Sequence, residues 1–299
     1  MFNRVRRRLE ERLDQAWTLA RWKLRAGPSY PRFDGDPRFA LLTVNRSTTR
    51  YLKLMLLTLC QQSALSQVVR IVICDNRSRD GGGPFLRRLA ARVARLHLVE
   101  NQFFLNHARG MRRCIDALTR LESGLAASSR SNLWLCCDTD LVFRNPATLV
   151  DLGRRFVHDQ AALAGELRRH HFAYPEAQAS FVAVRADWYT RPGIVPWVNH
   201  GSPSYWMQRS IWRAHGRVVD FPSNHGGYVL HRGRAAVAAI QRHDRLSSYA
   251  HVPTTAPHFM GVRDGAFIWR AIEAEHERWL DPAAEDELLD HLARRLGPR

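Results

Sequence analysis

Two aspartates separated by one residue follow a long apolar run, and they carry the clearest chemistry in this sequence. The run is Leu133 to Cys137, and the motif is Asp138-Thr139-Asp140. An uninterrupted apolar run of this length predicts a strand covered on both faces, as in a parallel sheet. In open α/β sheets, ligands bind beyond the carboxyl ends of the strands. Carboxylate oxygens suit Mg²⁺ or Mn²⁺, and such an ion can hold a diphosphate.

The same spacing occurs a second time, at Asp34-Gly35-Asp36, in a loop that contains Gly and Pro. This copy does not follow an apolar run, so nothing places it at the end of a strand. We therefore predict that the Asp138 copy is the functional one.

Polar residues also follow the three preceding predicted strands. These segments are Thr43 to Arg46, Asp75 to Gly82, Glu100-Asn101 and Asn106 to Gly110. Each one taken alone could be an ordinary turn, because Asp, Asn and Gly favour turns. The carboxyl ends of parallel strands meet at one edge of a sheet, so we expect these segments to line one crevice.

The elements that must position these residues alternate between strand and helix periodicity. The predicted strands are Phe39–Val44, Val68–Cys74, His97–Glu100 and Leu133–Cys137, and the predicted helices between them are Thr48–Cys60, Pro84–Leu96 and 107–124. This order predicts an α/β fold with a doubly wound, mostly parallel sheet flanked by helices. After Pro146 we expect a helix near 147–158, a strand around Ser180–Val184, an aromatic-rich stretch at 188–231, and a helical tail from Gly265.

Composition indicates a soluble globular protein. The chain has 299 residues, 45% of them hydrophobic. No apolar stretch approaches the roughly 18 to 20 residues needed to span a bilayer, and the N-terminus shows no secretory signal pattern. The five cysteines are odd in number and lack CxxC spacing, which favours reduced core thiols. We therefore expect a cytoplasmic protein.

The formal net charge of +17 favours anionic partners such as nucleic acid, acidic lipid headgroups or phosphorylated substrates. Residues 1–27 predict a basic amphipathic helix, which can lie on an anionic membrane or pack on its own domain. The first alternative would place the protein peripherally on the inner face of the membrane. No RNP, KH, zinc-finger or helix-turn-helix pattern is present, so we expect no nucleic acid partner.

The strand-end segments together carry a resemblance to a known family. Thr43 to Arg46, Asp75 to Gly81, Asn101 to Arg109 and Asp138 to Asp140 resemble, in order and spacing, the motifs of GT-A fold glycosyltransferases of family 2. These enzymes use nucleotide-sugar donors. The resemblance covers roughly residues 38–185, and the strand Ser180 to Arg185 is similar to the family strand that follows the metal motif.

The resemblance implies an organisation into three parts. These are a basic N-terminal helix and linker at 1–37, a GT-A glycosyltransferase domain at 38–245 and a C-terminal helical tail at 246–299. Within the domain, residues 38–145 would be the nucleotide-binding half and 146–245 the acceptor half.

The resemblance also implies roles for single residues. Thr43 and Asp75 would contact the nucleobase and ribose, and Arg109 the base or the diphosphate. Asp138 would lie near the ribose and the metal, and Asp140 would ligate the metal. The predicted donor-binding set is Thr43, Asn45, Arg46, Asp75, Asn76, Asn101, Arg109 and Asp138. A Mn²⁺ or Mg²⁺ ion there would act as a Lewis acid on the departing nucleoside diphosphate.

Family members often add a late histidine to the metal ligands. The segment Asn224 to Gly233 offers His225 and His231. His231 ends a short apolar run and precedes Arg-Gly, so we favour it. The predicted metal ligands are therefore Asp138, Asp140 and His231.

The general base is where the sequence departs from the family. Inverting members carry an acidic residue, often Glu-Asp, about a dozen residues before a Gly that ends the following helix. If that glycine is Gly216, the matching positions are Ser204-Tyr205, and neither is a carboxylate. The pair Glu285-Asp286 lies at a predicted helix start, where acidic residues interact favourably with the helix dipole.

The remaining base candidates are His200, Asp187 and Asp220, of which His200 lies closest to the expected position. The base stays unassigned. Trp197 and Trp206, flanked by Pro, Gly and Ser, are the predicted acceptor-binding aromatics; the alternative is that they belong to the core.

We predict a metal-dependent, inverting glycosyltransferase. Its donor would be UDP-, GDP- or dTDP-linked, and its acceptor a hydroxyl of a glycan, polysaccharide or lipid-linked glycan. One alternative is an inactive relative that binds a nucleotide or glycan and lacks the base. A less favoured alternative is a basic nucleic-acid-binding protein.

Overall fold

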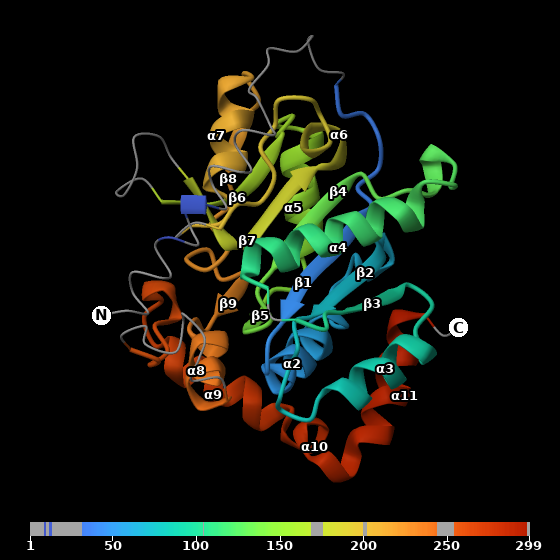
Figure 1. The fold of residues 1–299 in the computed structure, drawn as a ribbon, viewed down its shortest axis with the longest axis vertical. Coiled ribbons are helices and arrows are strands. Elements are labelled where there is room, and N and C mark those ends of the chain that lie inside the picture. Colours follow the sequence, from blue (N-terminus) through green and yellow to red (C-terminus); the bar gives the residue numbers. More distant parts are fainter. Residues whose placement is uncertain are drawn as a thin grey trace.

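The structure is a computed structural model of the chain, and it describes residues 9, 12–13, 32–103, 105–168, 176–199, 202–243 and 254–297. In the described part, a seven-stranded sheet runs through the centre with helices on both faces (Figure 1). The predicted α/β class and mostly parallel sheet are confirmed. No helix within the described residues could span a bilayer.

The main sheet has the strand order β3-β2-β1-β4-β7-β6-β8. Its strands are β1 (Phe39–Asn45), β2 (Val68–Asp75), β3 (Leu96–Glu100), β4 (Leu133–Cys137), β6 (Leu163–Arg168), β7 (Glu176–Arg185) and β8 (Val218–Asp220). Strand β7 runs antiparallel to both of its neighbours. A separate antiparallel pair is formed by β5 (Leu141–Phe143) and β9 (Val229–His231).

The central strands are buried along their whole length. Every residue of β1 and of β4 is buried, as expected for parallel strands with helices on both sides. Asn45 lies beside Asp75, and Asp75 lies beside Glu100, so the first three strands end level with one another. Strands β1, β2 and β3 are added in one direction, and β4 then pairs with the other side of β1. This reversal is the point where open α/β sheets bind ligands.

The helices vary from one turn to four turns in length. They are α2 (Thr49–Leu59), α3 (Gly83–Arg92), α4 (His107–Glu122), α5 (Thr148–Val157), α6 (Ala186–Tyr189), α7 (Tyr205–Arg213), α8 (Ala235–His243), α9 (Gly265–Glu275), α10 (Glu277–Leu280) and α11 (Glu285–Leu296). Short 3₁₀ helices are η1 (Leu65–Gln67), η2 (Ala127–Ser129), η3 (Phe259–Gly261) and η4 (Pro282–Ala284).

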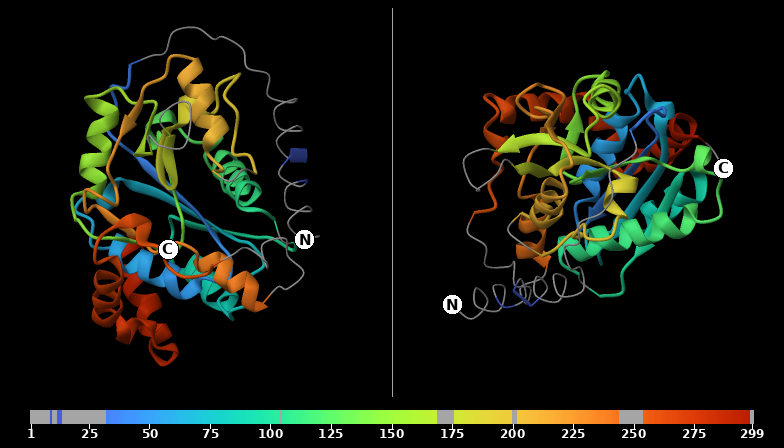
Figure 2. Two further views of the ribbon diagram at one scale, coloured as in Figure 1. Left: turned by 90° about the vertical axis from the view of Figure 1, so that its left-hand side faces the viewer. Right: turned by 90° about the horizontal axis from the view of Figure 1, so that it is seen from above.

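Two hydrophobic cores lie on opposite faces of the sheet. Helices α2, α3, α5 and α11 contribute to one core, through side chains such as Leu52, Leu86 and Phe156. Helices α4, α6 and α7 contribute to the other, through side chains such as Met111 and Met207. Figure 2 shows the sheet between these helix layers.

Several predicted boundaries are corrected by the structure. The helix predicted at Pro84–Leu96 ends at Arg92, because Val93 is extended and Leu96 already belongs to β3. The strand predicted at Ser180–Val184 is longer and starts at Glu176. Strands β6 and β8 were not predicted. Residues 1–27 lie outside the described residues, apart from Leu9, Arg12 and Leu13, which are exposed.

Candidate active site

Three elements bring Asp138, Asp140 and His231 together. Asp138 directly follows β4, and Asp140 directly precedes β5. His231 ends β9 and pairs across the small sheet with Leu141, the residue after Asp140. The backbone N–H of Arg232 donates to the carbonyl of Asp140 at 2.9 Å, which fixes the two segments together. The small β5–β9 pair therefore positions the histidine beside the aspartates.

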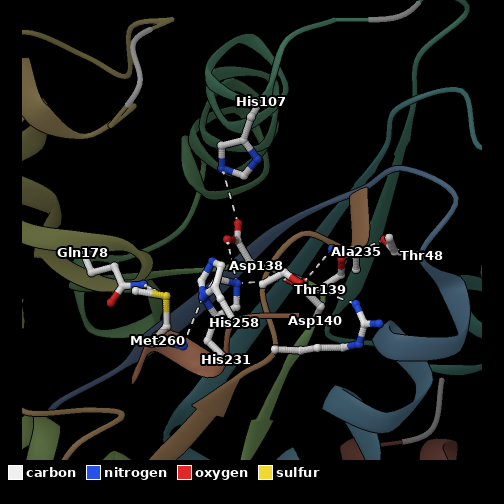
Figure 3. Close-up of polar contacts among 12 residues, drawn as sticks. Thr48, His107, Asp138, Thr139, Asp140, Gln178, His231, Ala235, His258 and Met260 are labelled. Atoms are coloured by element: carbon white, nitrogen blue, oxygen red, sulfur yellow. Dashed lines mark hydrogen bonds and ion pairs between the residues drawn. The ribbon is translucent and has the colours of Figure 1, made fainter. Parts of the chain in front are cut away.

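The three side chains converge on one point (Figure 3). His231 Nε2 lies 3.3 Å from Asp138 Oδ2 and 3.2 Å from Asp140 Oδ1. One ligand atom from each residue lies within 4.8 Å of the others. The N–H of Ala235, the first residue of α8, donates to Asp140 Oδ2 at 3.1 Å. This bond holds the other carboxylate oxygen toward His231.

The charges of the three groups depend on one another. Burial by itself disfavours the imidazolium of His231, but the neighbouring carboxylates of Asp140 and Asp138 outweigh it and raise its pKa to about 10. Burial raises the pKa of Asp140, whereas His231 and the N–H of Ala235 lower it, and the net shift is downward. In the metal-free protein, a proton on His231 thus supplies the positive charge that the carboxylates need.

The donor set fits a divalent cation. Two carboxylates and an imidazole are ligands that Mn²⁺ accepts well, and carboxylates suit Mg²⁺. His231 Nδ1 is buried without a hydrogen-bond partner in the described part of the chain, so Nε2 is the nitrogen aimed at the carboxylates. A metal ion would take the place of the proton on Nε2, because a ligating histidine must be neutral.

A further histidine borders the site, and sequence reasoning missed it. His107 is the first residue of α4, and its Nε2 lies 3.7 Å from Asp138 Oδ1. In Figure 3, His107 and His231 lie on opposite sides of the Asp138 carboxylate. The Asn106 side chain caps α4 by accepting from the N–H of Arg109 at 2.9 Å, and the cap places His107 at the helix start. The signal in the sequence was its position in the polar segment before α4.

His258 was also missed. It precedes η3, and its ring lies edge-on to the ring of His231 with the centroids 6.0 Å apart. Its Nδ1 accepts from the N–H of Met260 at 3.1 Å. No spacing in the sequence relates this segment to Asp138, so only the fold reveals the contact.

Hydrogen bonds connect the predicted donor site with the metal motif. Asn45 Nδ2 donates to Asp75 Oδ1 at 3.0 Å, and Asn45 Oδ1 accepts from the Thr48 hydroxyl at 2.9 Å. The Thr48 hydroxyl also lies 2.8 Å from that of Thr139. These hydrogen bonds join the ends of β1 and β2 to the Asp138-Thr139-Asp140 segment after β4.

Three other predicted donor residues hold the neighbouring loops. Asn76 Oδ1 accepts from the side chain of Asn101 at 3.3 Å and from the N–H of Leu105 at 2.9 Å. Arg46 Nη1 donates to the carbonyl of Asn76 at 2.9 Å. All three predicted residues are buried. Their contact with a donor stays a prediction.

Thr43 and Arg109 differ in exposure. Thr43 is fully buried in β1, and its hydroxyl has no hydrogen-bond partner among the described residues. Arg109 is exposed near the start of α4. Their assigned contacts with the nucleotide also remain predictions.

The predicted acceptor and base residues differ from one another in burial and in position. Trp197 is fully buried, with its ring edge-on to His107 at 6.0 Å between centroids. Trp206 is half-buried on α7. His200 lies outside the described residues. His225 pairs with Glu166 instead of the aspartates, so of the two late histidines His231 is the one in the cluster.

The other carboxylates considered as a base have structural partners. Asp187 forms two hydrogen bonds with Arg185, at 2.9 and 2.6 Å. Asp220 accepts from the N–H of Leu167 at 2.9 Å.

Comparison with solved structures finds glycosyltransferases. TarS 1-349 from S. aureus has a TM-score of 0.48 and 10% identity, over 87% of this chain and 88% of that one. The mannosyltransferase PcManGT from Pyrobaculum calidifontis, in complex with GDP-Man and Mn²⁺, has a TM-score of 0.49 and 15% identity, over 97% and 81%. No protein-family model matches the sequence, and no curated protein matches it. With TM-scores below 0.5, the assignment of function rests on the residues of the site.

Proposed function

We propose that this chain is a glycosyltransferase. It would transfer a sugar from a nucleoside diphosphate sugar to a hydroxyl acceptor, with Mn²⁺ or Mg²⁺ held by Asp138, Asp140 and His231. The observation that carries the proposal is the convergence of these side chains beyond the carboxyl end of β4, beside β1, where the order of the strands reverses. The position is the ligand site of open α/β sheets, and the donor set suits a cation that binds diphosphate.

Several residues of this chain would support the reaction. The bound ion would supply Lewis-acid stabilisation of the departing nucleoside diphosphate. The N–H of Ala235 holds Asp140, and the contact between the Thr48 and Thr139 hydroxyls ties the metal motif to the loop after β1. Asp75 and Asn45, hydrogen-bonded at the ends of two neighbouring strands, lie at the position from which the resemblance implies contact with the nucleoside.

The acceptor and the stereochemistry belong to the same proposal. A glycan, polysaccharide or lipid-linked glycan hydroxyl would attack the anomeric carbon from the side opposite the nucleotide, which inverts its configuration. Trp206, half-buried at the start of α7, is the better placed of the two predicted acceptor aromatics because Trp197 is fully buried.

Donor turnover is the test of this function. Release of UDP or GDP from UDP-glucose, UDP-GlcNAc and GDP-mannose should require Mn²⁺ or Mg²⁺ and should stop on chelation. Asp140→Asn should lose this release. Asp36→Asn, in the other Asp-x-Asp copy at the opposite edge of the sheet, is the matched control and should behave as wild type. Equal turnover by wild type and Asp140→Asn would refute the metal assignment. Binding of a nucleotide without any turnover would favour the inactive-relative alternative.

We also propose that residues 1–27 attach the protein peripherally to an anionic membrane on its cytoplasmic side. The support is the basic amphipathic pattern, together with the exposure of Leu9 and Leu13, which are spaced one helical turn apart. Full-length protein should sediment with vesicles that contain phosphatidylglycerol, and protein lacking residues 1–27 should stay in the supernatant. Equal sedimentation of both proteins would remove this segment from the account.

A further inference from the structure

A buried carboxylate, that of Glu176, lies at the same edge of the sheet as the proposed metal ligands. Glu176 is the first residue of β7, and its side chain is fully buried. Because β7 is antiparallel to β4, its first residues lie at the edge where β4 ends. The N–H of Asp138 donates to the carbonyl of Ser180 at 3.0 Å, and Glu176 lies four residues before Ser180 in β7. In this stretch the register between β7 and β6 shifts: Gly165 pairs with Val182 and Leu167 with Ala177.

The carboxylate of Glu176 is only partly satisfied. Ser202 donates its hydroxyl to Oε1. Oε2 has no hydrogen-bond partner among the described residues, and the nearest cation there is Arg168 Nη2 at 4.0 Å. Buried polar atoms are nearly always hydrogen-bonded, so an unpaired carboxylate oxygen calls for a functional explanation. An incoming hydroxyl group would supply the missing donor.

Glu176 also lies beside the start of α7, where the family resemblance implies an acidic residue. The side chain of Gln208, on α7, bonds both to the N–H and to the carbonyl of Ala177 at 2.7 Å. The same amide donates to the hydroxyl of Ser204 at 2.7 Å. Ser204 and Tyr205 are the positions that match the acidic pair of the family, and neither is acidic. The structure thus places a carboxylate from β7 next to the site from which the sequence lacks one.

We propose that Glu176 is the general base of the transfer, an inference that rests on the proposed function. The acceptor hydroxyl gives its proton to Glu176 Oε2, and its oxygen forms a bond with the anomeric carbon. The bond between that carbon and the diphosphate oxygen breaks, and its electron pair leaves with the nucleoside diphosphate. In the proposed complex, the anomeric carbon and the attacking hydroxyl lie between the metal ligands that follow β4 and Glu176 at the start of β7.

The surroundings of Glu176 favour this role. Burial raises the pKa of its carboxyl group, while the Ser202 hydrogen bond and the positive charge of Arg168 lower it, and the net shift is upward. A raised pKa makes a carboxylate a stronger base near neutral pH. Arg168 on β6 is the charged side chain that faces it in the described structure, and Ser202 comes from the loop before α7.

Glu176→Gln tests the proposal most directly. Glutamine keeps the shape of the side chain and cannot take up the proton. With the nucleotide sugar that the wild type turns over, and with water or a supplied acceptor, nucleotide release should fall by about 100-fold or more. Mn²⁺-dependent binding of the nucleotide should be unchanged. Glu122→Gln is the matched control, because Glu122 is also buried and bonded to a serine, Ser131, at the other edge of the sheet.

Ser202→Ala provides a second test that leaves the carboxylate in place. Losing the hydrogen bond to the charged form raises the pKa of Glu176. At saturating Mn²⁺, the fall of kcat/KM on the acidic side should therefore move to higher pH than in wild type. A merely structural Glu176 would leave this profile where it is. If Glu176→Gln does not fold, this shift decides the question alone.

The outcomes distinguish failure of the Glu176 assignment from failure of the proposed glycosyltransferase function. Turnover by Glu176→Gln within about threefold of wild type, or an unshifted profile in Ser202→Ala, would overturn the assignment of Glu176. Loss of turnover in His200→Ala but not in Glu176→Gln would make His200 the base. A wild type that binds no nucleotide with Mn²⁺ would refute the proposed function itself.

Discussion

His231 lies between the carboxylates of Asp138 and Asp140. This arrangement explains how the two negative charges are balanced. Without a metal ion, the carboxylates raise the pKa of His231 to about 10, so that the imidazole is protonated at neutral pH. A divalent cation carries more charge than this proton and can replace it. The geometry that holds the proton is therefore also the one that the proposed metal site requires.

His107 contacts Asp138, one of the three proposed metal ligands. Its Nε2 lies 3.7 Å from Asp138 Oδ1, while the other oxygen of that carboxylate faces His231. A side chain that orients a metal ligand typically contributes 10- to 100-fold in metal affinity. We predict that His107→Ala weakens Mn²⁺ binding by about that factor, as measured by calorimetry. His158→Ala, an exposed histidine after α5, should bind Mn²⁺ like wild type. If His107→Ala also binds like wild type, His107 does not orient Asp138.

At the scale of elements, the close contact between α4 and β1 fixes the edge of the site. A Cβ added at Gly110 would lie 2.8 Å from a methyl group of Val44. In an exposed helix interior, alanine would be about 1 kcal/mol more stable than glycine. Here we expect Gly110→Ala to destabilise the fold by about 1–3 kcal/mol, because α4 must move away from β1.

Urea unfolding measures this effect. Gly124→Ala is the control, since nothing lies within 4 Å of the added Cβ. Adding Val44→Ala to Gly110→Ala should recover part of the loss because it makes room for the new methyl group. A Gly110→Ala protein at least as stable as wild type would contradict this packing.

Elements with local signals were predicted well, and those that depend on tertiary pairing were not. The run Leu133 to Cys137 is strand β4 without a shift, because a strand buried on both faces reads as continuous apolar sequence. The helix at Pro84 was predicted too long, because Val93 and Leu96 continue its apolar spacing although Leu96 belongs to β3. Strand β8 is partly exposed and three residues long, too short to show a period.

The residues of the candidate site also fall into those that a local sequence pattern predicted and those that only the fold reveals. Asp138 and Asp140 could be predicted because they follow a strand with a clear pattern. His231 was favoured over His225 from the apolar run before it, and it is the one in the cluster. His107 was marked only by its place in the polar segment Asn106 to Gly110, and Glu176 by no pattern, because their positions depend on the packing of α4 and on the antiparallel β7.

At the scale of the whole molecule, ion pairs hold the C-terminal helix α11 against α2 and α3. Lys53 Nζ lies 2.9 Å from Glu285, and Arg88 lies 3.3 Å from the same carboxylate. Arg92 Nη1 lies 2.6 Å from Asp290. Glu285, the first residue of α11, thus forms a structural ion pair with Lys53 of α2. Part of the large basic charge is neutralised within the fold in this way.

The five cysteines are distributed through the two cores, and all are free and buried. Burial raises the pKa of Cys60 to about 12 despite the nearby Arg295, and it raises the pKa of Cys136 further. We predict that the native protein does not react with Ellman's reagent. All five thiols should react after unfolding in guanidinium chloride. Rapid reaction of a native thiol would show that one of these cores opens readily.

Calorimetric titration of UDP, GDP and dTDP, with and without Mn²⁺, tests the central claim most directly. We predict that one of the three nucleotides binds the wild type only when Mn²⁺ is present. Asp36→Asn should bind it equally well, and Asp140→Asn should lose the metal-dependent binding. Unchanged binding by Asp140→Asn, or no binding of any nucleotide by the wild type, would contradict a metal-dependent nucleotide-sugar site at Asp138, Asp140 and His231.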